Sequence, residues 1–257
     1  MIPYVGGKSK ISKWVVGNFP ENYQKLSYIE VFGGAGWVML RKEPSSCEVY
    51  NDRNDHLVAL WEAMRDEGEE FERRSGWTLH SRSMFGKALI ALKGASDRDD
   101  IDHALQFAIA QTMSFSGTGK TYGYARSGKP SWNAFCRRIE RVRERLMPIQ
   151  VENLDFEDLI TRYDSDKAFF YLDPPYVDAE HYYSVSFGIE DHRRLAAVLK
   201  GIKGRFALSY YPHPLVDELY GEYRKVSIEA VKSSCGITRG SVVRERPRAT
   251  ELLIMNY

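Results

Sequence analysis

Five consecutive apolar or aromatic residues, Ala168 to Leu172, end abruptly at an aspartate and two prolines, Asp173-Pro174-Pro175. A short apolar run bounded in this way is typical of a strand at the centre of a parallel sheet, where both faces are buried. Parallel strands need crossover connections, which are usually helices. The segment therefore predicts an α/β protein, and the carboxyl end of this strand is a place where such sheets bind ligands.

The first part of the chain predicts a glycine-rich loop after a strand. Residues 26–32 are expected to form the strand, Gly33-Gly34-Ala35-Gly36 the loop, and residues 37–40 the start of a helix. The glycines lack the spacing of a dinucleotide fingerprint because Met39 stands at its last position. They still allow a ligand to approach the backbone closely.

A second strand and helix complete the opening unit. Residues 47–50 predict a strand that ends at Asn51-Asp52, and Asn54 or Asp55 is expected to cap a helix over residues 57–65. The order of strand, glycine loop, helix, strand and acidic turn is the beginning of a doubly wound, Rossmann-like nucleotide-binding sheet.

The middle of the chain has helical periodicity and no convincing core strand between residues 71 and 147. Residues 100–113 are the clearest amphipathic helix, and a loop rich in Gly, Ser, Lys and Tyr follows over residues 114–131. Alternation then resumes, with strands expected at 149–153, 168–172, 205–209 and 250–256 and helices at 156–162 and 190–200. We therefore predict one α/β domain, residues 1–65 and 148–257, with an inserted, mainly helical subdomain at residues 66–147.

Basic residues are concentrated in this insertion, although the net charge of the chain is only +1. Such a stretch suits a polyanion-binding face, but a solvated helix surface has the same appearance, and both interpretations stay open. Only Glu140 and Glu144 oppose the basic residues between positions 120 and 147, which are Lys120, Arg126, Lys129, Arg137, Arg138, Arg141, Arg143 and Arg145.

Other classes of protein are not indicated. The three cysteines form no CxxC pair, so we expect neither a disulfide framework nor a metal site. We find no secretory leader and no apolar run of the roughly 18–20 residues that cross a bilayer, so we expect a cytoplasmic protein.

The segment Asp173-Pro174-Pro175-Tyr176 has the groups needed to act on an amino group. Two prolines fix two φ angles, so the loop is stiff and presents carbonyl oxygens and a carboxylate in a preset direction. These acceptors suit an –NH₂ group, and Tyr176 offers a planar ring a face to stack on. The alternative is a strand-ending turn in which Asp173 only caps.

Several motifs together resemble the DNA adenine-N6 methyltransferases, in the order cofactor motifs, target-recognition region and DPPY. The resemblance covers nearly the whole chain and includes solitary and phage-borne members of that family. The motifs that carry it are Tyr4-Val5-Gly6-Gly7-Lys8, Phe32-Gly33-Gly34-Ala35-Gly36, Asn51-Asp52, Asn153-Leu154-Asp155-Phe156, Asp173-Pro174-Pro175-Tyr176 and the closing strand from Arg248 to Tyr257.

The resemblance implies a methyltransferase-type sheet with a helical target-recognition insertion, and S-adenosylmethionine as methyl donor, with S-adenosylhomocysteine as product. Asp52 would bond the ribose hydroxyls, Lys8 would meet the methionine carboxylate, and Tyr4 would lie beside the sulfonium. Phe156 and Asp155 would contact the cofactor's adenine. The implied cofactor-binding residues are Tyr4, Gly7, Lys8, Phe32, Gly33, Gly34, Gly36, Asp52, Asp155, Phe156 and Asp173, and the implied catalytic residues are Asp173, Pro174, Pro175 and Tyr176.

The implied reaction is site-specific methylation of the adenine amino group in double-stranded DNA, by base flipping and in-line transfer without a metal. Arg126 is a candidate for guanine contact, and Arg137, Arg138 and Arg141 for phosphate contacts. The full set of expected DNA-binding residues is Lys120, Arg126, Ser127, Lys129, Arg137, Arg138 and Arg141. We expect a monomer in a bacterial or phage-infected cell, close to the nucleoid.

Two alternatives remain open at this stage. One is an amino-group methyltransferase that acts on cytosine or another substrate, although cytosine enzymes tend to have Ser at the place of Asp173 and glutamine enzymes Asn. The other is a catalytically silent, DNA-binding relative. Pro3 departs from the family pattern, which has a basic residue before the N-terminal aromatic, so any base contact from there is in doubt.

Overall fold

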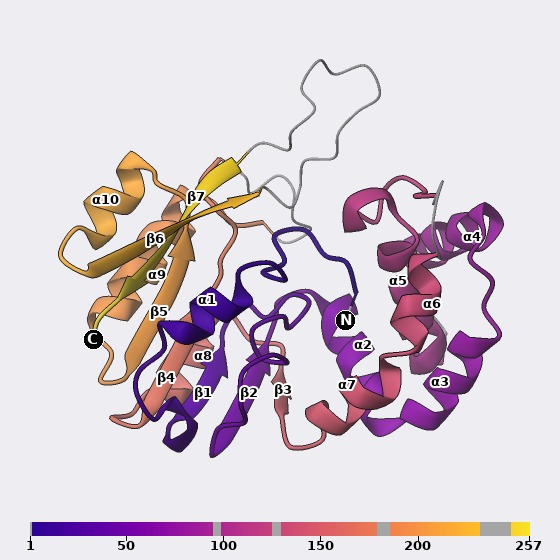
Figure 1. Ribbon diagram of the computed structural model, residues 1–257, viewed down its shortest axis with the longest axis horizontal. Coiled ribbons are helices and arrows are strands. Elements are labelled where there is room, and N and C mark those ends of the chain that lie inside the picture. The colour runs from indigo at the N-terminus through magenta and orange to yellow at the C-terminus, as the bar shows by residue number, and fades with distance from the viewer. Residues whose placement is uncertain (1, 95–98, 125–129, 179–185, 232–247) are drawn as a thin grey trace.

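The computed structural model describes residues 2–94, 99–124, 130–178, 186–231 and 248–257. Its centre is a seven-stranded sheet in the order β3-β2-β1-β4-β5-β7-β6 (Figure 1). The strands are β1 (Ser27–Glu30), β2 (Cys47–Asn51), β3 (Gln150–Glu152), β4 (Ala168–Leu172), β5 (Arg205–Tyr210), β6 (Arg224–Val231) and β7 (Arg248–Met255).

The sheet is doubly wound. Strands β1 to β5 pair in parallel, whereas β7 pairs antiparallel with both β5 and β6. From β1 the sheet extends one way to β2 and β3, and from β4 it extends the other way to β5 and beyond, so the switch point lies between the ends of β1 and β4. Every residue of β4 is buried, which confirms the central strand expected from its apolar run.

Helices connect the strands, as the parallel topology requires. The predictions for α2, α8 and α9 are confirmed, and the side chain of Asn54 caps α2 by accepting from the His56 N–H at 3.1 Å. We did not predict α1, α10 or β6. The connecting elements are α1 (Ser12–Gly17), η1 (Tyr23–Lys25), α2 (Asp55–Asp66), α8 (Phe156–Tyr163), α9 (Ile189–Lys200) and α10 (Pro214–Tyr220).

The prediction of a helix after the glycine loop is wrong. Residues 37–40 form turns, in which Leu40 N–H donates to the Gly36 carbonyl at 2.9 Å, but no helix follows. Gly36 has a left-handed φ of 62°, and Pro44 disfavours a helical conformation at the residue before it. The segment is therefore too short between these two points to propagate a helix.

The insertion is helical, as predicted, and its clearest expected helix corresponds to α5. Among its described residues, the only strand-like pairing is an isolated bridge between Ser114 and Tyr122. Figure 1 shows α3 to α6 standing beside the sheet rather than over it. The insertion comprises α3 (Gly68–Gly76), α4 (Arg82–Lys93), α5 (Asp100–Thr112), η2 (Phe115–Gly117), α6 (Ser131–Cys136) and α7 (Ile139–Leu146).

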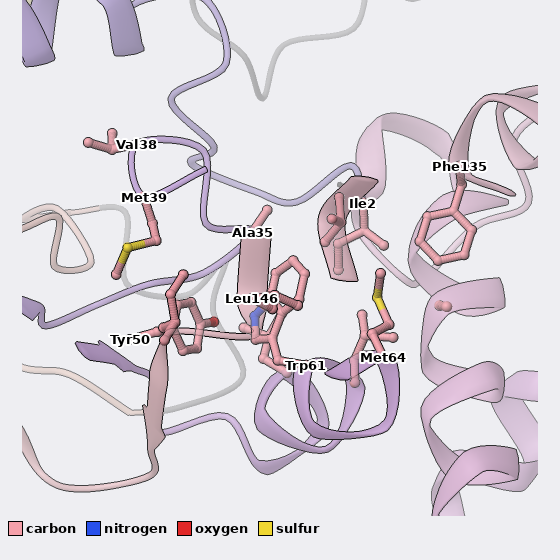
Figure 2. Close-up of a cluster of buried hydrophobic side chains, with 14 of the residues drawn as sticks. Ile2, Ala35, Val38, Met39, Tyr50, Trp61, Met64, Phe135 and Leu146 are labelled. Atoms are coloured by element: carbon pink, nitrogen blue, oxygen red, sulfur yellow. The ribbon is translucent and has the colours of Figure 1, made fainter. Parts of the chain in front are cut away.

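One buried apolar cluster runs from the sheet into the insertion. Figure 2 shows Ile2 and the Trp61 and Met64 side chains of α2 beside Phe135 and Leu146 of the insertion. The insertion therefore shares its core with the rest of the chain, and the division at residues 66 and 147 stays a prediction. No helix in the described ranges is long and apolar enough to cross a membrane.

Candidate active site

A cavity of about 420 Å³ lies at the switch point of the sheet. The loop after β1, the turn after β2 and the loop after β4 all contribute to its walls, because parallel strands end at one edge. The expected site residues that line it are Tyr4, Gly7, Lys8, Phe32, Gly33, Gly34, Asp52, Asp155, Phe156, Asp173 and Pro175.

Three expected site residues are not part of the cavity lining. Gly36 instead forms the left-handed turn that closes the glycine loop. Pro174, within the DPPY loop, is buried. The Tyr176 side chain is 6% exposed, and its hydroxyl donates a short hydrogen bond to Glu251.

The backbone of the glycine loop packs directly against the side chain of Tyr50. A Cβ at Gly33 would clash with the ring of Tyr50, and Gly34 has a left-handed φ of 51°. The Tyr50 hydroxyl donates to the Gly34 carbonyl at 2.6 Å, which holds the loop against β2. These positions therefore require glycine for steric reasons.

Asp52 is held by the same loop. Its two carboxylate oxygens accept from the backbone N–H groups of Gly34 and Asn54, each at 2.8 Å. Burial raises the pKa of Asp52 to about 6, against the lowering effect of these two hydrogen bonds. Each oxygen keeps a further lone pair, so the carboxylate can accept hydroxyl groups from a ligand.

Lys8 and Asp173 form an ion pair in the wall of the same cavity. The Lys8 ammonium donates to the two Asp173 oxygens at 2.6 and 2.7 Å and to the Gly6 carbonyl at 3.2 Å. Burial raises the pKa of Asp173, and the charge and hydrogen bond of Lys8 oppose that rise. The lysine thus favours the ionised carboxylate in a site that would otherwise protonate it.

A second carboxylate, Glu251 on β7, belongs to the same network. Glu251 is 4% exposed, lies 3.4 Å from the Lys8 ammonium and accepts from the Tyr176 hydroxyl. Burial raises its pKa, and Lys8 opposes the rise. We assigned Glu251 no role from the sequence, although an acidic residue within an otherwise apolar closing strand is the pattern that indicates a functional one.

Three aromatic rings form part of the cavity wall. The ring centroids of Phe32, Phe156 and Phe187 lie 5.7 to 5.9 Å from one another. We did not predict Phe187, because a single phenylalanine before a helix is equally typical of ordinary packing. Together the three rings give a planar ligand an apolar surface.

Charged groups cover part of this aromatic wall. Asp155 caps α8 and pairs with Arg53 at 3.2 Å and with Arg194 at 3.0 Å. The Arg194 guanidinium lies 4.4 Å from the centroid of the Phe156 ring. A planar ligand can therefore stack on that face of Phe156 only if Arg194 moves.

Glu30, at the end of β1, is a further buried acid that the sequence interpretation did not include. It lies on the cavity wall, is 2% exposed and accepts from the Tyr28 hydroxyl at 2.7 Å. Burial raises the pKa of Glu30 to about 8. Glu30 is therefore mostly uncharged at neutral pH. The cavity wall has four other acidic residues against three basic ones: Asp52, Asp155, Asp173 and Asp191 against Lys8, Arg53 and Arg194.

The sequence was compared with models of known protein families and with curated proteins. Over residues 4–234 the sequence matches the family model for D12 class N6 adenine-specific DNA methyltransferase. The chain belongs to this family. The methyltransferase therefore acts on adenine in DNA, as the DPPY loop and the order of motifs indicated. A comparison with curated proteins finds no match.

The expected DNA-binding residues of the methyltransferase are only partly described. Lys120, Arg137, Arg138 and Arg141 are exposed side chains of the insertion. Arg126, Ser127 and Lys129 lie outside the described residues. Not every basic residue of this stretch is available to DNA, because Arg145 donates to the buried Glu48 at 2.7 Å.

Metal binding by the methyltransferase was not expected. In the ranges that the structure describes, no group of three or more His, Cys, Asp or Glu side chains is arranged to hold a metal ion. The absence of a metal from the reaction stays a prediction.

Proposed function

We propose that the chain transfers a methyl group from S-adenosylmethionine to the exocyclic amino group of adenine in double-stranded DNA. One observation carries the proposal. The Asp173 carboxylate, the Gly33-Gly34 loop and the acidic Asp52 line a single cavity at the switch point of the sheet. A methyl donor bound by the last two would have its reactive end within the same enclosure as the first.

The residues of the cavity fit this donor. S-adenosylmethionine carries one net positive charge, and the cavity wall has more carboxylates than cations. Asp52 has lone pairs for the ribose hydroxyls, and Phe32, Phe156 and Phe187 offer an apolar wall to the adenine ring. The residues that line the cavity are thus suited to the ribose and adenine of the donor.

The N-terminal motif would bind the methionine end. Tyr4 lies on the cavity wall, and its hydroxyl accepts from Asn54 at 3.1 Å, which fixes the ring beside the expected position of the sulfonium. Lys8 can meet the methionine carboxylate only by sharing its ammonium with Asp173. This sharing would place the donor next to the proposed catalytic carboxylate.

S-adenosylmethionine supplies the methyl group from its sulfonium in one in-line displacement. Asp173 and the Pro174 carbonyl would accept the two amino hydrogens of adenine. These hydrogen bonds localise the nitrogen lone pair and stabilise the positive charge that develops on nitrogen in the transition state. Orientation of two bound reactants can contribute up to about 7–11 kcal/mol of the remaining barrier reduction.

The target base has to leave the duplex to reach Asp173, at a cost of a few kcal/mol. Stacking on Tyr176 would recover part of that cost. The Tyr176 ring is covered, with the Lys8 ammonium 4.9 Å from its centroid and the Tyr211 ring at 4.5 Å. Stacking there requires one of these neighbours to move, so we expect base entry to rearrange this part of the site.

We further expect a monomer that acts in the cytoplasm of a bacterial or phage-infected cell. The basic residues of the insertion would contact the DNA, with Arg126 in a groove and Arg137, Arg138 and Arg141 at phosphates.

A direct test uses tritium-labelled S-adenosylmethionine with duplex DNA, followed by digestion to nucleosides. The expected product is labelled N6-methyladenine. Label in methylcytosine would contradict the substrate, and binding of DNA without any transfer would favour the catalytically silent alternative.

A further inference from the structure

A second cavity, of about 380 Å³, adjoins the cofactor cavity. The two share Tyr4, Gly7 and Trp37 as walls. The N-terminal segment separates them, because Lys8 lines the first cavity and the next two residues, Ser9 and Lys10, line the second. The second cavity is therefore beside the methyl-transfer site but is not part of it.

The insertion forms the other side of this second cavity. Thr112 ends α5, Ser131 begins α6, and Arg138 precedes α7, and all three line the cavity. The two sides are in tight contact, since a Cβ at Gly117 would lie 2.7 Å from the Pro3 carbonyl carbon. The cavity thus lies at the seam between the catalytic sheet and the insertion.

The charge of the second cavity is opposite to that of the first. Lys10 and Arg138 line it, and none of its described lining residues is Asp or Glu. Neither cation forms an ion pair within the described part of the chain, whereas Arg145 of the neighbouring helix is bound to Glu48. Lys10 and Arg138, from separate parts of the chain, can therefore both bind an anionic ligand.

Hydroxyl groups complete the walls of this cavity. Ser9, Ser116, Ser131 and Thr112 all contribute. Thr112 is 2% exposed, and its hydroxyl has no hydrogen-bond partner among the residues that the structure describes. Buried polar groups are normally satisfied, so an unsatisfied hydroxyl in the wall of a basic cavity is consistent with a ligand that has acceptor oxygens.

We propose that the second cavity binds a backbone phosphate of the substrate DNA, held by Lys10 from the catalytic part and Arg138 from the insertion. The inference rests on the proposed function, because that function makes DNA the polyanion which reaches this face. A phosphate held here would lie next to the cavity that contains Asp173. It would fix the position of the target strand without specifying its sequence.

The test compares the variants Lys10→Ala and Arg138→Ala with Lys13→Ala in binding to duplex DNA over a range of salt concentrations. Lys13 is the matched control, since it is an exposed lysine of α1 that does not line the cavity. Each cavity variant should weaken binding to all sequences similarly and reduce the slope of log K against log salt by about 1. The control should leave the slope near that of the wild type.

Equal slopes for Lys10→Ala and Lys13→Ala would overturn the inference. A free anion is the other source of the same chemistry, and inorganic phosphate at constant ionic strength separates the two. We expect no competition with DNA at millimolar phosphate, and strong competition that both cavity variants abolish would assign the cavity to a free anion instead.

Methyl transfer by the wild type distinguishes this inference from the proposed function. If the wild type methylates adenine while both cavity variants bind DNA normally, only the phosphate site is wrong. If the wild type transfers no methyl group, the proposed function itself fails.

Discussion

Lys8 and Asp173 lie 165 residues apart in the sequence, and their side chains form an ion pair with N–O distances of 2.6 and 2.7 Å. The pair joins the N-terminal motif to the DPPY loop and is largely shielded from water, with side-chain exposures of 7% and 17%. Lys8 therefore favours the ionised form of the carboxylate that we propose as catalytic, against the effect of burial. If Lys8 also meets the methionine carboxylate, as proposed, donor binding and the ionisation of Asp173 are coupled through this lysine.

Replacement of Lys8 by Met should move the acid limb of the pH–rate profile to higher pH. Burial already raises the pKa of Asp173, and loss of the lysine removes the charge that opposes the rise. Since the reaction requires the ionised carboxylate, activity would be lost at a higher pH than in the wild type. Lys8→Arg keeps the charge and is the control. An acid limb unchanged in Lys8→Met would contradict this role.

Glu251→Gln should move the same limb the other way. Glutamine still offers an oxygen to the Tyr176 hydroxyl, but it no longer competes with Asp173 for the Lys8 ammonium. The pKa of Asp173 should fall, and the enzyme should stay active to lower pH. Glu251→Leu should instead destabilise the fold by about 1–3 kcal/mol, because it leaves a buried hydroxyl unsatisfied. Identical pH profiles for Glu251→Gln and wild type would show that the two carboxylates do not share the lysine.

Affinity for S-adenosylmethionine should increase as the pH rises from 6 to 8. Burial raises the pKa of Asp52 to about 6 and that of Glu30 to about 8, so both carboxyls lose protons across this range. A cationic ligand binds better to the ionised forms, and calorimetry at several pH values measures the trend. Glu30→Gln should flatten the part of the curve near pH 8, and a curve of unchanged shape would exclude Glu30 from the effect.

Gly33→Ala should destabilise the protein by about 1–3 kcal/mol in chemical denaturation, the usual cost of overpacking. The new methyl group would collide with the Tyr50 ring, which is itself held by a hydrogen bond to Gly34. Gly86→Ala is the matched control, because no atom lies within 4 Å of a Cβ there and the residue is within α4. The control should raise stability by up to about 1 kcal/mol. Equal stabilities of the two variants would mean that the loop adapts freely.

Local patterns were enough to predict the central part of the fold. The apolar run of β4 and the prolines after it act within a few residues, so both the strand and the loop were predictable. The helix after Gly36 was predicted wrongly because Pro44, which disfavours a helical conformation just before it, leaves too few residues for a helix. Strand β6 was missed although Val226, Ile228 and Ala230 alternate with polar residues, which is the pattern of a half-buried strand.

The residues of the site were easier to predict from the sequence than the contacts between them. Most of the expected cofactor residues line one cavity, because motifs at the carboxyl ends of parallel strands have to converge. The ion pair of Lys8 with Asp173 and the approach of Glu251 depend on tertiary packing between segments far apart in the chain. Arg194 over Phe156 is of the same kind, since no local pattern indicates which ring an arginine will cover.

The most direct test of the account is methyl transfer by Asp173→Ala to duplex DNA, measured as N6-methyladenine after digestion. The transfer rate should fall about a hundredfold to a thousandfold, as for loss of one group that stabilises transition-state charge. DNA binding should be retained, because the expected DNA contacts lie elsewhere. A variant that methylates adenine at the wild-type rate would contradict the central role given to Asp173.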